Sequence, residues 1–420
     1  MFPKMPEAYR SDITVIGAGI IGICCALRLA EKGLQVALVD RNNPAEGASH
    51  GNAGVISSWA CVPQSLPGQW KKIPGWIIDP AGPIALRWSY APRMFNWLLR
   101  FLDSAQLNRV NDIADALLLV NRDSFLLYQQ MLEDTGSEDL VTESHYIHVF
   151  RNSAAADPRL LQWALRRERG VPMDFIDGDE LREIEPALSN EYKAAVVIQN
   201  QGRALNPGRL GQALAEKAQS LGVSFVRAEI KDLQLIKPDH WLINHKAGVI
   251  PARKVILAAG AWSAQLLRPL GCEIPLEAER GYHVVFSEPG AQLNNSILDN
   301  EGHFAASSMD MGLRCAGIAE FAGLVALPDY RRAQMLARLA KRMLPNLNTD
   351  SVSEWMGSRP ATPDSLPCIG RVPGQDGLFG AFGHGHGGLT GAPTTGQWVA
   401  DLVNNEMSDS ELFSYRLDRF

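Results

Sequence analysis

Residues 13–40 carry a pattern that is typical of a dinucleotide-binding unit. An apolar run at 13–16 leads into Gly17-Ala18-Gly19-Ile20-Ile21-Gly22, and a second apolar run at 36–39 ends at Asp40. The first glycine allows a tight turn, the second lets a pyrophosphate approach the backbone, and the third lets helix and strand pack closely. The pattern predicts a strand, a helix over about 20–32 that ends near Gly33, and a second strand.

The acidic residue after the second strand indicates which nucleotide would bind. Asp40 lies 23 positions after Gly17, where a carboxylate accepts hydrogen bonds from a ribose diol. A carboxylate there disfavours a 2′-phosphate, so the sequence favours FAD or NAD over NADP. The amino end of the predicted helix adds free N–H groups and a positive dipole for the pyrophosphate.

Composition excludes several classes of protein. With 420 residues and 46% hydrophobic content, the chain can bury a large core in about two or three domains, which can be interleaved in sequence. A net charge of −6, without a dominant stripe of lysine and arginine, argues against nucleic-acid binding. The six cysteines show neither CxxC spacing nor histidine pairs at zinc-ligand spacing, so we expect no disulfide and no metal, as in a reducing cytoplasm.

Targeting signals are not evident. Residues 1–10 lack the positive start and apolar core of a secretory signal, and no window reaches about 18 uninterrupted apolar residues. We therefore expect a cytoplasmic protein that does not span a membrane.

The stretch 59–103 is rich in tryptophan, proline and isolated basic residues. One interpretation is a loop followed by amphipathic helices that cover a second domain. The other is a surface that rests on a membrane interface, where tryptophan and basic side chains are stable. Residues 108–133 then predict one long helix.

The middle of the chain returns to alternating helix and strand signals. Asn206 and Pro207 predict a helix start, and Gly222 predicts its end. Strand-like runs follow at 223–228, 233–236, 241–245 and 254–258, and the last enters a glycine turn that contains Ala259, Gly260 and Trp262. Sheet and loop with one helix at 330–344 are expected from 272 to about 348.

The carboxy-terminal segment is the second informative region. An apolar strand at 378–382 enters a loop with His384, Gly385, His386, Gly387 and Gly388, and a small-residue helix follows to about Val403. This arrangement places backbone N–H groups and a helix amino terminus beside a flat ligand.

Taken together, these motifs resemble the FAD-dependent D-amino-acid oxidase and dehydrogenase superfamily, most closely its D-amino-acid dehydrogenase branch. The resemblance covers nearly the whole chain: the segments are 13–40, 48–54, the strand ending at Gly260, Arg280-Gly281-Tyr282, 313–320, 359–370 and 383–393. It implies an α/β fold in which a Rossmann-like FAD-binding domain is interleaved with a substrate domain built on a mixed β-sheet. We assign 1–58, 206–268 and 351–420 to the FAD-binding domain, and 59–205 and 269–350 to the substrate domain, with 59–103 as a candidate membrane-surface segment.

The resemblance also implies a set of FAD-binding positions, with the cofactor held non-covalently. These are Gly17, Ala18, Gly19, Ile20, Ile21, Gly22, Asp40, Arg41, Ala48, Ser49, Asn52, Ala53, Gly54, Val55, Ala259, Gly260, Trp262, Gly385, Gly387, Gly388, Leu389 and Thr390. A helix amino terminus near the last of them would stabilise the negative charge of a reduced flavin.

The resemblance makes Arg359 the candidate ligand of a substrate carboxylate, because the family places an arginine of an arginine-proline motif there and a guanidinium suits a bidentate contact. Tyr282, Arg314, His50 and His386 are further candidates at the substrate. For each of these four, an ordinary structural role remains open.

The resemblance implies oxidation of a free amino acid, in the first place a D-amino acid, with a cyclic one such as a D-hydroxyproline included among the substrates. Hydride would pass from the α-carbon to flavin N5, with positioning supplying most of the rate, and electrons would pass to a quinone or another acceptor, with contact at the inner face of a membrane. Three alternatives stay open: a sarcosine or glycine oxidase, a 2-hydroxy acid dehydrogenase, and a flavin-bearing subunit of a larger complex.

Overall fold

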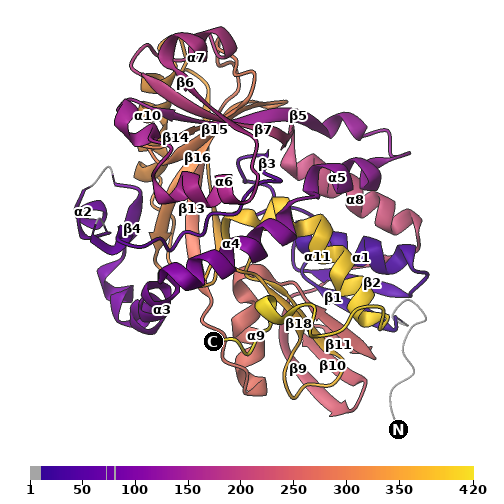
Figure 1. The fold of residues 1–420 in the computed structure, drawn as a ribbon. Helices are drawn as coiled ribbons and strands as arrows, with labels where there is room; N and C mark the ends of the chain where they lie inside the picture. Colours follow the sequence, from indigo (N-terminus) through magenta and orange to yellow (C-terminus); the bar gives the residue numbers. More distant parts are fainter. Residues whose placement is uncertain (1–10, 72, 80–81) are drawn as a thin grey trace.

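The computed structural model describes residues 11–71, 73–79 and 82–420, so the predicted lack of a signal at 1–10 lies outside the described residues. Two large sheets organise the chain, one in the lower and one in the upper part of Figure 1.

The six-stranded sheet has the order β18-β19-β12-β1-β2-β8, and all neighbours are parallel except β18 and β19. Its strands are β1 (Ile13–Ile16), β2 (Val36–Asp40), β8 (Ser224–Arg227), β12 (Lys254–Leu257), β18 (Cys368–Arg371) and β19 (Leu378–Phe382). The parallel arrangement places the carboxyl ends of β1, β2 and β12 at one edge, where nucleotide ligands bind in such sheets.

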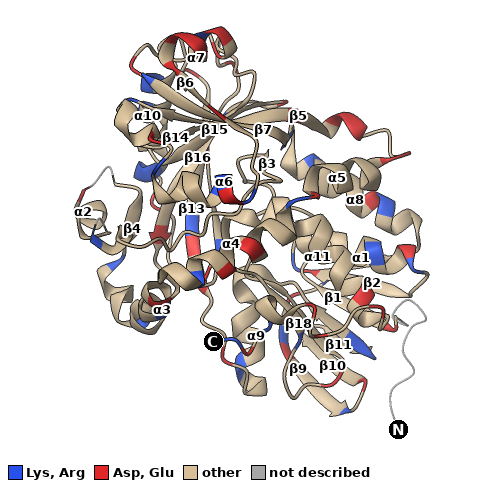
Figure 2. Cartoon of the chain, in the orientation of Figure 1, with Lys and Arg blue, Asp and Glu red and all other residues tan. Residues whose placement is uncertain are grey.

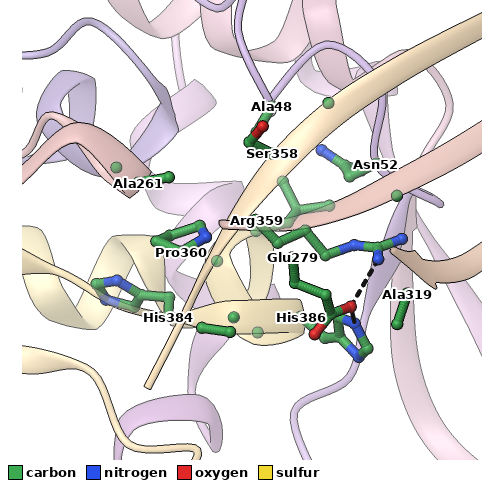
Figure 3. Close-up of a pocket in the computed structure, with 18 of the residues that line it drawn as sticks. Ala48, Asn52, Ala261, Glu279, Ala319, Ser358, Arg359, Pro360, His384 and His386 are labelled. Carbon is green, nitrogen blue, oxygen red and sulfur yellow. Dashed lines mark hydrogen bonds and ion pairs between the residues drawn. The ribbon is translucent and has the colours of Figure 1, made fainter. Parts of the chain in front are cut away.

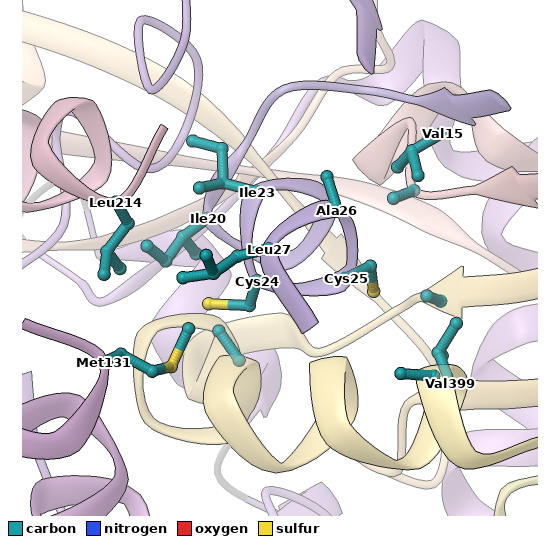
Figure 4. Close-up of a cluster of buried hydrophobic side chains, with 14 of the residues drawn as sticks. Val15, Ile20, Ile23, Cys24, Cys25, Ala26, Leu27, Met131, Leu214 and Val399 are labelled. Carbon is teal, nitrogen blue, oxygen red and sulfur yellow. The ribbon is translucent and has the colours of Figure 1, made fainter. Parts of the chain in front are cut away.

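Both faces of this sheet are covered, which explains why its strands are almost wholly apolar. On one face lie α1 (Ile20–Glu31), α8 (Pro207–Ser220) and α11 (Gly388–Val403), and α1 packs against α11 although the two helices lie near opposite ends of the chain. Figure 4 shows this core, where Ile23, Cys24 and Leu27 of α1 meet Val399, Leu214 and Met131. The other face is covered by α9 (Ser263–Leu267) and by a three-stranded antiparallel sheet of β9 (Ile230–Lys237), β10 (His240–His245) and β11 (Gly248–Ala252).

The larger sheet is mixed and has the order β17-β13-β16-β15-β14-β5-β7-β3, while β4 pairs with β16 and β6 with β7. Its strands are β3 (Val55–Ile56), β4 (Ile84–Leu86), β5 (Val141–Phe150), β6 (Met173–Asp177), β7 (Ala194–Ala204), β13 (Glu277–Phe286), β14 (Ser296–Asp299), β15 (Phe304–Met309), β16 (Gly312–Phe321) and β17 (Val352–Ala361). Around it lie α6 (Leu161–Glu168), α7 (Gly178–Ile184) and α10 (Arg331–Met343). The α/β class and the mixed second sheet agree with the prediction.

The domain division stays a prediction, with one boundary affected by the sheets. β17 falls inside the segment 351–420 that was assigned to the FAD-binding domain, yet its residues pair with β13 in the mixed sheet. The chain therefore passes from the mixed sheet to the six-stranded sheet after Ala361, the last residue of β17. Ala361 also forms an isolated bridge with His384.

The predicted helix at 108–133 is wrong as a single element. The chain forms α4 (Leu107–Asn121) and α5 (Ser124–Leu132) instead. Side chains on both sides of the break contact residues 58–60. Asn121 Nδ2 donates to the carbonyl of Ala60 (2.9 Å), and the hydroxyls of Ser124 and Ser58 lie 3.1 Å apart. Such tertiary contacts outweigh a continuous helical pattern.

The segment 59–103 forms two helices beside the mixed sheet, at the left of Figure 1. These are α2 (Ile73–Ile78) and α3 (Ala91–Ser104). Met94 and Trp97 are buried against Phe321 and Ala361, as the covering role predicts. Within the described residues, no helix combines the length and the apolar content needed to cross a bilayer.

Candidate active site

A cavity of about 1110 Å³ runs from the carboxyl edge of the six-stranded sheet to the face of the mixed sheet. Most of the predicted site residues line it, from Asp40 and Arg41 at one end to Arg359 and His386 at the other. Ala18, Gly22, His50 and Arg314 are not among its lining residues.

The turn after β1 is packed so tightly that only glycine fits at two positions. Gly17 has φ +109°, and a Cβ there would lie 2.3 Å from the carbonyl oxygen of Ala258. A Cβ at Gly22 would lie 1.8 Å from the carbonyl oxygen of Gly17. Gly22 thus acts in packing beneath the turn, which is the role that its place in the motif predicts.

Asp40 holds this turn from the next strand. Its carboxylate accepts hydrogen bonds from the N–H groups of Ala18 (2.7 Å) and Asn42 (2.9 Å) while it lines the cavity. Beside it, the guanidinium of Arg41 lies 4.1 Å from the ring centroid of Trp262. A carboxylate and a flat cation–aromatic pair at this edge suit a ribose and its base. The contact of Asp40 with a ribose stays a prediction.

The loop 47–54 forms the wall next to the turn. The hydroxyl of Ser49 accepts from the N–H of Ile20 at the start of α1 (2.8 Å). Asn52 closes the loop on itself, because its Nδ2 donates to the Ser49 carbonyl (2.7 Å) and its Oδ1 accepts from the N–H of Gly54 (2.8 Å). The loop thereby presents Ala48, Ser49, Asn52 and Ala53 to the cavity.

Arg314 is not among the residues that line the cavity, so its predicted contact with a substrate stays a prediction. It is buried in β16, and its Nη1 donates to the carbonyls of His50 and Asn52, at 2.9 Å each, so it supports the loop from behind. Burial lowers the pKa of Arg314 to about 10. The side chain of His50 likewise lies off the cavity, with its ring 6.2 Å from that of Trp355. Sequence alone could not separate these roles because β16 and the loop are over 260 residues apart.

The second helix amino terminus at the cavity belongs to α11. Gly385, Gly387, Gly388, Leu389 and Thr390 all line the cavity there. Tyr128 from α5 donates to the carbonyl of Leu389 (2.7 Å), and the hydroxyl of Thr390 accepts from the N–H of Ser57 (3.2 Å). These contacts fix the helix start, whose partial positive charge faces the cavity.

At the mixed sheet, the carboxylate of Glu279 is bonded to two side chains, those of Arg359 and His386. Glu279 of β13 stands directly opposite Arg359 of β17 in the antiparallel ladder. Its Oε1 accepts from Nη1 of Arg359 (2.8 Å) and from Nε2 of His386 (2.5 Å), and Figure 3 shows the carboxylate bonded to both side chains. Burial raises the pKa of Glu279, but His386 and Arg359 outweigh burial and hold the pKa at about 2, so Glu279 is ionised.

Two further features place the Arg359 guanidinium. Its Nη1 also donates to the carbonyl of Ile318 (3.0 Å), a β-branched residue with φ +64° at a bulge between β13 and β16. The guanidinium lies over Gly281, where a Cβ would be 2.2 Å from Cζ. The Ile318 conformation is costly for such a residue, so the surrounding sheet must impose it.

Tyr282 lines the cavity, but its hydroxyl is already engaged. It donates to Glu320 Oε2 (2.6 Å) and accepts from the N–H of Asp329 (3.0 Å). Burial, followed by the bond to Glu320, raises the pKa of Tyr282 to about 12. Its proposed contact with a substrate carboxylate stays a prediction that would require the hydroxyl to exchange a partner.

Sequence reasoning missed Glu279, Gln64 and Ile318. Glu279 carried a signal, an acidic residue two positions before Gly281 on the same face of a largely apolar strand. Gln64, whose Nε2 lies 2.6 Å from Nδ1 of His386, sits in an irregular loop and carried no signal. The pairing of β13 with β17 places Glu279 beside Arg359, whereas Ile318 and Gln64 are found only through their contacts with Arg359 and His386.

The cavity fits an extended dinucleotide such as FAD. The glycine turn leaves no room for side chains, the amino ends of α1 and α11 both reach the cavity, and acceptor and aromatic groups gather at the Asp40 end. The glycine turn and the amino end of α1 match a diphosphate, the amino end of α11 matches the pyrimidine edge of a flavin, and the Asp40 end matches an adenosine. None of the described residues that line the cavity is a cysteine.

Comparisons with known proteins agree with this geometry. The family model described as DAO, FAD dependent oxidoreductase, matches residues 12–402. A D-amino-acid oxidase of Bradyrhizobium diazoefficiens is 37% identical over 423 residues, which covers 99% of this chain and 100% of the relative. Among solved structures, glycine oxidase from Geobacillus kaustophilus has a TM-score of 0.76 at 22% identity, covering 98% of this chain and 99% of that one. L-proline dehydrogenase from P. horikoshii has a TM-score of 0.73 at 22% identity, covering 99% and 98%.

Proposed function

The chain belongs to the DAO family of FAD-dependent oxidoreductases, and on that premise we propose that it oxidises the α-carbon of a free amino acid, in the first place a D-amino acid. FAD is its cofactor. The observation that carries the proposal is Arg359, a guanidinium fixed by Glu279 and Ile318 on the wall of the cavity that fits FAD.

Arg359 has donors left for a ligand. Both hydrogens of Nη1 are taken by Glu279 and by the Ile318 carbonyl, which leaves Nη2 and Nε. The side chain is 23% exposed, so these donors can face the cavity. A carboxylate accepts two parallel bonds from such a guanidinium edge, and this contact would fix the orientation of the α-carbon.

The remaining chemistry needs little acid–base work from the chain. When bound, FAD supplies the two-electron acceptor, and we infer that the α-hydrogen leaves as a hydride towards flavin N5. The amino end of α11 would stabilise the negative charge that develops on that side of the cavity. The product imino acid takes up water and gives a 2-oxo acid and ammonia, or stays a cyclic imine when the substrate is a proline derivative.

The preference for the D configuration rests on the relative that is 37% identical along the whole chain and is named a D-amino-acid oxidase. We include cyclic D-amino acids such as D-hydroxyprolines among the substrates to be tried first. We also infer that FAD is bound non-covalently, so acid precipitation of the protein should release all of the flavin into the supernatant.

The experiment is anaerobic reduction of the purified yellow protein by a panel of D- and L-amino acids and 2-hydroxy acids. We expect a D-amino acid to bleach the flavin, and Arg359→Ala to need a far higher concentration of that amino acid. A protein that is bleached by hydroxy acids alone would contradict the proposal.

We further propose that the electrons pass to a quinone or a similar carrier at a membrane surface. α3 exposes Phe95, Leu98 and Leu99 together with Arg93 and Arg100, and Trp88 before it is 73% exposed. The charge map in Figure 2 shows basic residues along this edge. Apolar side chains flanked by arginine suit a lipid interface.

Flotation with anionic vesicles tests this surface. The wild-type protein should float, and the double variant Trp88→Ser, Phe95→Ser should remain at the bottom while its flavin is still reduced by the substrate. Equal flotation of both proteins would contradict the membrane contact. Faster reoxidation of the reduced flavin by oxygen than by a soluble quinone would contradict the choice of acceptor.

A further inference from the structure

Glu279 is the ionised side chain at the centre of the substrate end of the cavity, and it is almost fully enclosed. Its side chain is 3% exposed, whereas those of Arg359 and His386 are 23% and 53% exposed. A carboxylate in such a place is stable only when cations or donors surround it. Arg359 and His386 supply this from two separate parts of the chain, β17 and the loop before α11.

The charges around Arg359 do not favour an anion when His386 is neutral. Glu279 already balances Arg359, so the group of three side chains carries no net charge in that state. A second carboxylate on the same guanidinium then meets the negative charge of Glu279. When His386 is protonated, the three side chains together carry one positive charge, which balances the negative charge of an incoming carboxylate.

The surroundings of His386 allow both protonation states. Nε2 faces Oε1 of Glu279 and therefore carries a hydrogen, while Nδ1 faces Nε2 of Gln64 at 2.6 Å and accepts a hydrogen in the neutral state. Rotating the Gln64 amide by half a turn would present its oxygen to an Nδ1–H in the protonated state. The backbone N–H of Gln64 is held by the hydroxyl of Ser365 (3.0 Å), so the amide can turn while its backbone stays in place.

The charged and titratable groups at His386 come from two strands. Glu279 belongs to β13, and Arg359 of β17 acts on the imidazole through Glu279. His384 on the same loop is buried and bonded to the Thr395 hydroxyl (2.9 Å), and burial lowers its pKa to about 3, so it stays neutral. The change of charge in this part of the cavity therefore falls on His386.

We propose that Glu279 is a positioning residue that aims Arg359 into the cavity and couples the binding of a substrate carboxylate there to proton uptake by His386. Gln64 accommodates both states of the imidazole by turning its amide. The proposal rests on the proposed function only in taking Arg359 as the carboxylate ligand. It implies that amino-acid binding weakens as pH rises and His386 loses its proton, and that His386 is protonated when the substrate carboxylate is bound.

The test measures binding without turnover. Acetate, a carboxylate with no amine to oxidise, is titrated into the oxidised FAD-bound protein by calorimetry in two buffers of different ionisation enthalpy, between about pH 6 and pH 9. We expect uptake approaching one proton per acetate, and a dissociation constant that rises by up to about tenfold per pH unit where uptake is complete.

Three variants separate this coupling from a merely structural role. In His386→Gln, acetate still binds, but proton uptake is lost and the dissociation constant no longer depends on pH. In Glu279→Gln, uptake moves to lower pH, and Glu279→Asp restores part of it. His240→Gln, a surface histidine of β10 outside the cavity, is the matched control and should behave as the wild type.

Acetate binding without proton uptake in the wild type would overturn the proposal, and so would unchanged uptake in His386→Gln. His386 is more than half exposed, so this variant decides the question even where Glu279→Gln does not fold. The outcome is distinct from that of the proposed function. If acetate binding takes up a proton but no amino acid reduces the flavin, this inference stands and the proposed function is refuted. If an amino acid reduces the flavin but acetate binds without proton uptake, the proposed function stands and this inference is refuted.

Discussion

Replacing Gly281 by alanine should damage substrate binding while leaving the fold intact. A Cβ at this position would lie 2.2 Å from Cζ and Nη2 of Arg359 and 2.5 Å from Nη1. Unstrained contacts between such atoms need about 3.5 Å, so the guanidinium must move by about 1 Å or more. The atoms it meets are the end of a flexible side chain, so the free energy of unfolding should fall by no more than about 1–3 kcal/mol.

The displaced guanidinium can no longer keep both of its anchors on Glu279 and Ile318 and still meet a carboxylate with two donors. Losing one charge-assisted hydrogen bond costs about 1.5–3 kcal/mol, which corresponds to roughly a 10- to 150-fold weaker apparent affinity.

The assay is the rate of anaerobic flavin reduction against amino-acid concentration, with thermal melting measured in parallel. Gly75→Ala is the control, because a Cβ at Gly75 in α2 meets nothing within 4 Å. An unchanged apparent affinity in a folded Gly281→Ala protein would refute the position assigned to Arg359.

Three other predictions follow from the same contacts. Arg314→Leu leaves the carbonyls of His50 and Asn52 without their donor, so FAD should dissociate more readily, which is measured by the fluorescence of released flavin on dilution; wild-type retention would contradict the supporting role. Gly22→Ala puts a Cβ 1.8 Å from the Gly17 carbonyl oxygen, so the protein should be recovered colourless or unfolded, and a yellow, stable variant would show that the turn can relax. Burial lowers the pKa values of His148, His283 and His384 to about 3, below the value near 6.5 of the unfolded chain. The unfolded state therefore binds more protons, and stability should be lost as pH falls from about 6.5 towards 3, by up to about 1.4 kcal/mol per pH unit for each histidine. Denaturant unfolding at about pH 7 and pH 5 measures this loss, and His283→Gln should show a smaller one.

Local signals predicted the parts of the fold that are local. The glycine motif marked β1, α1 and β2 closely, and Asn206 with Pro207 marked the start of α8, where the Asn206 side chain accepts from the N–H of Arg209. Each of these elements is specified by residues within one turn of its end.

The substrate end of the cavity could not be predicted in the same way, because it is assembled from distant strands. Arg359 was identified through a resemblance, but its partner Glu279 became visible only when β13 and β17 paired across 80 residues. The role of Arg314 likewise depends on residues that are distant in the sequence. An arginine in a strand is compatible with a substrate contact or with support of a loop, and only the position of residues 50–52 decides between them.

The central claim is that Arg359 binds the substrate's carboxylate. The most direct test removes the guanidinium from the protein and, separately, the carboxylate from the substrate. Anaerobic flavin reduction is compared for the wild type and Arg359→Ala with D-alanine and with ethylamine, which is the same amine without the carboxylate. The account predicts that the substitution slows reduction by D-alanine at low concentration at least about 100-fold and leaves the slow reaction of ethylamine unchanged. An equal loss with both compounds would contradict it.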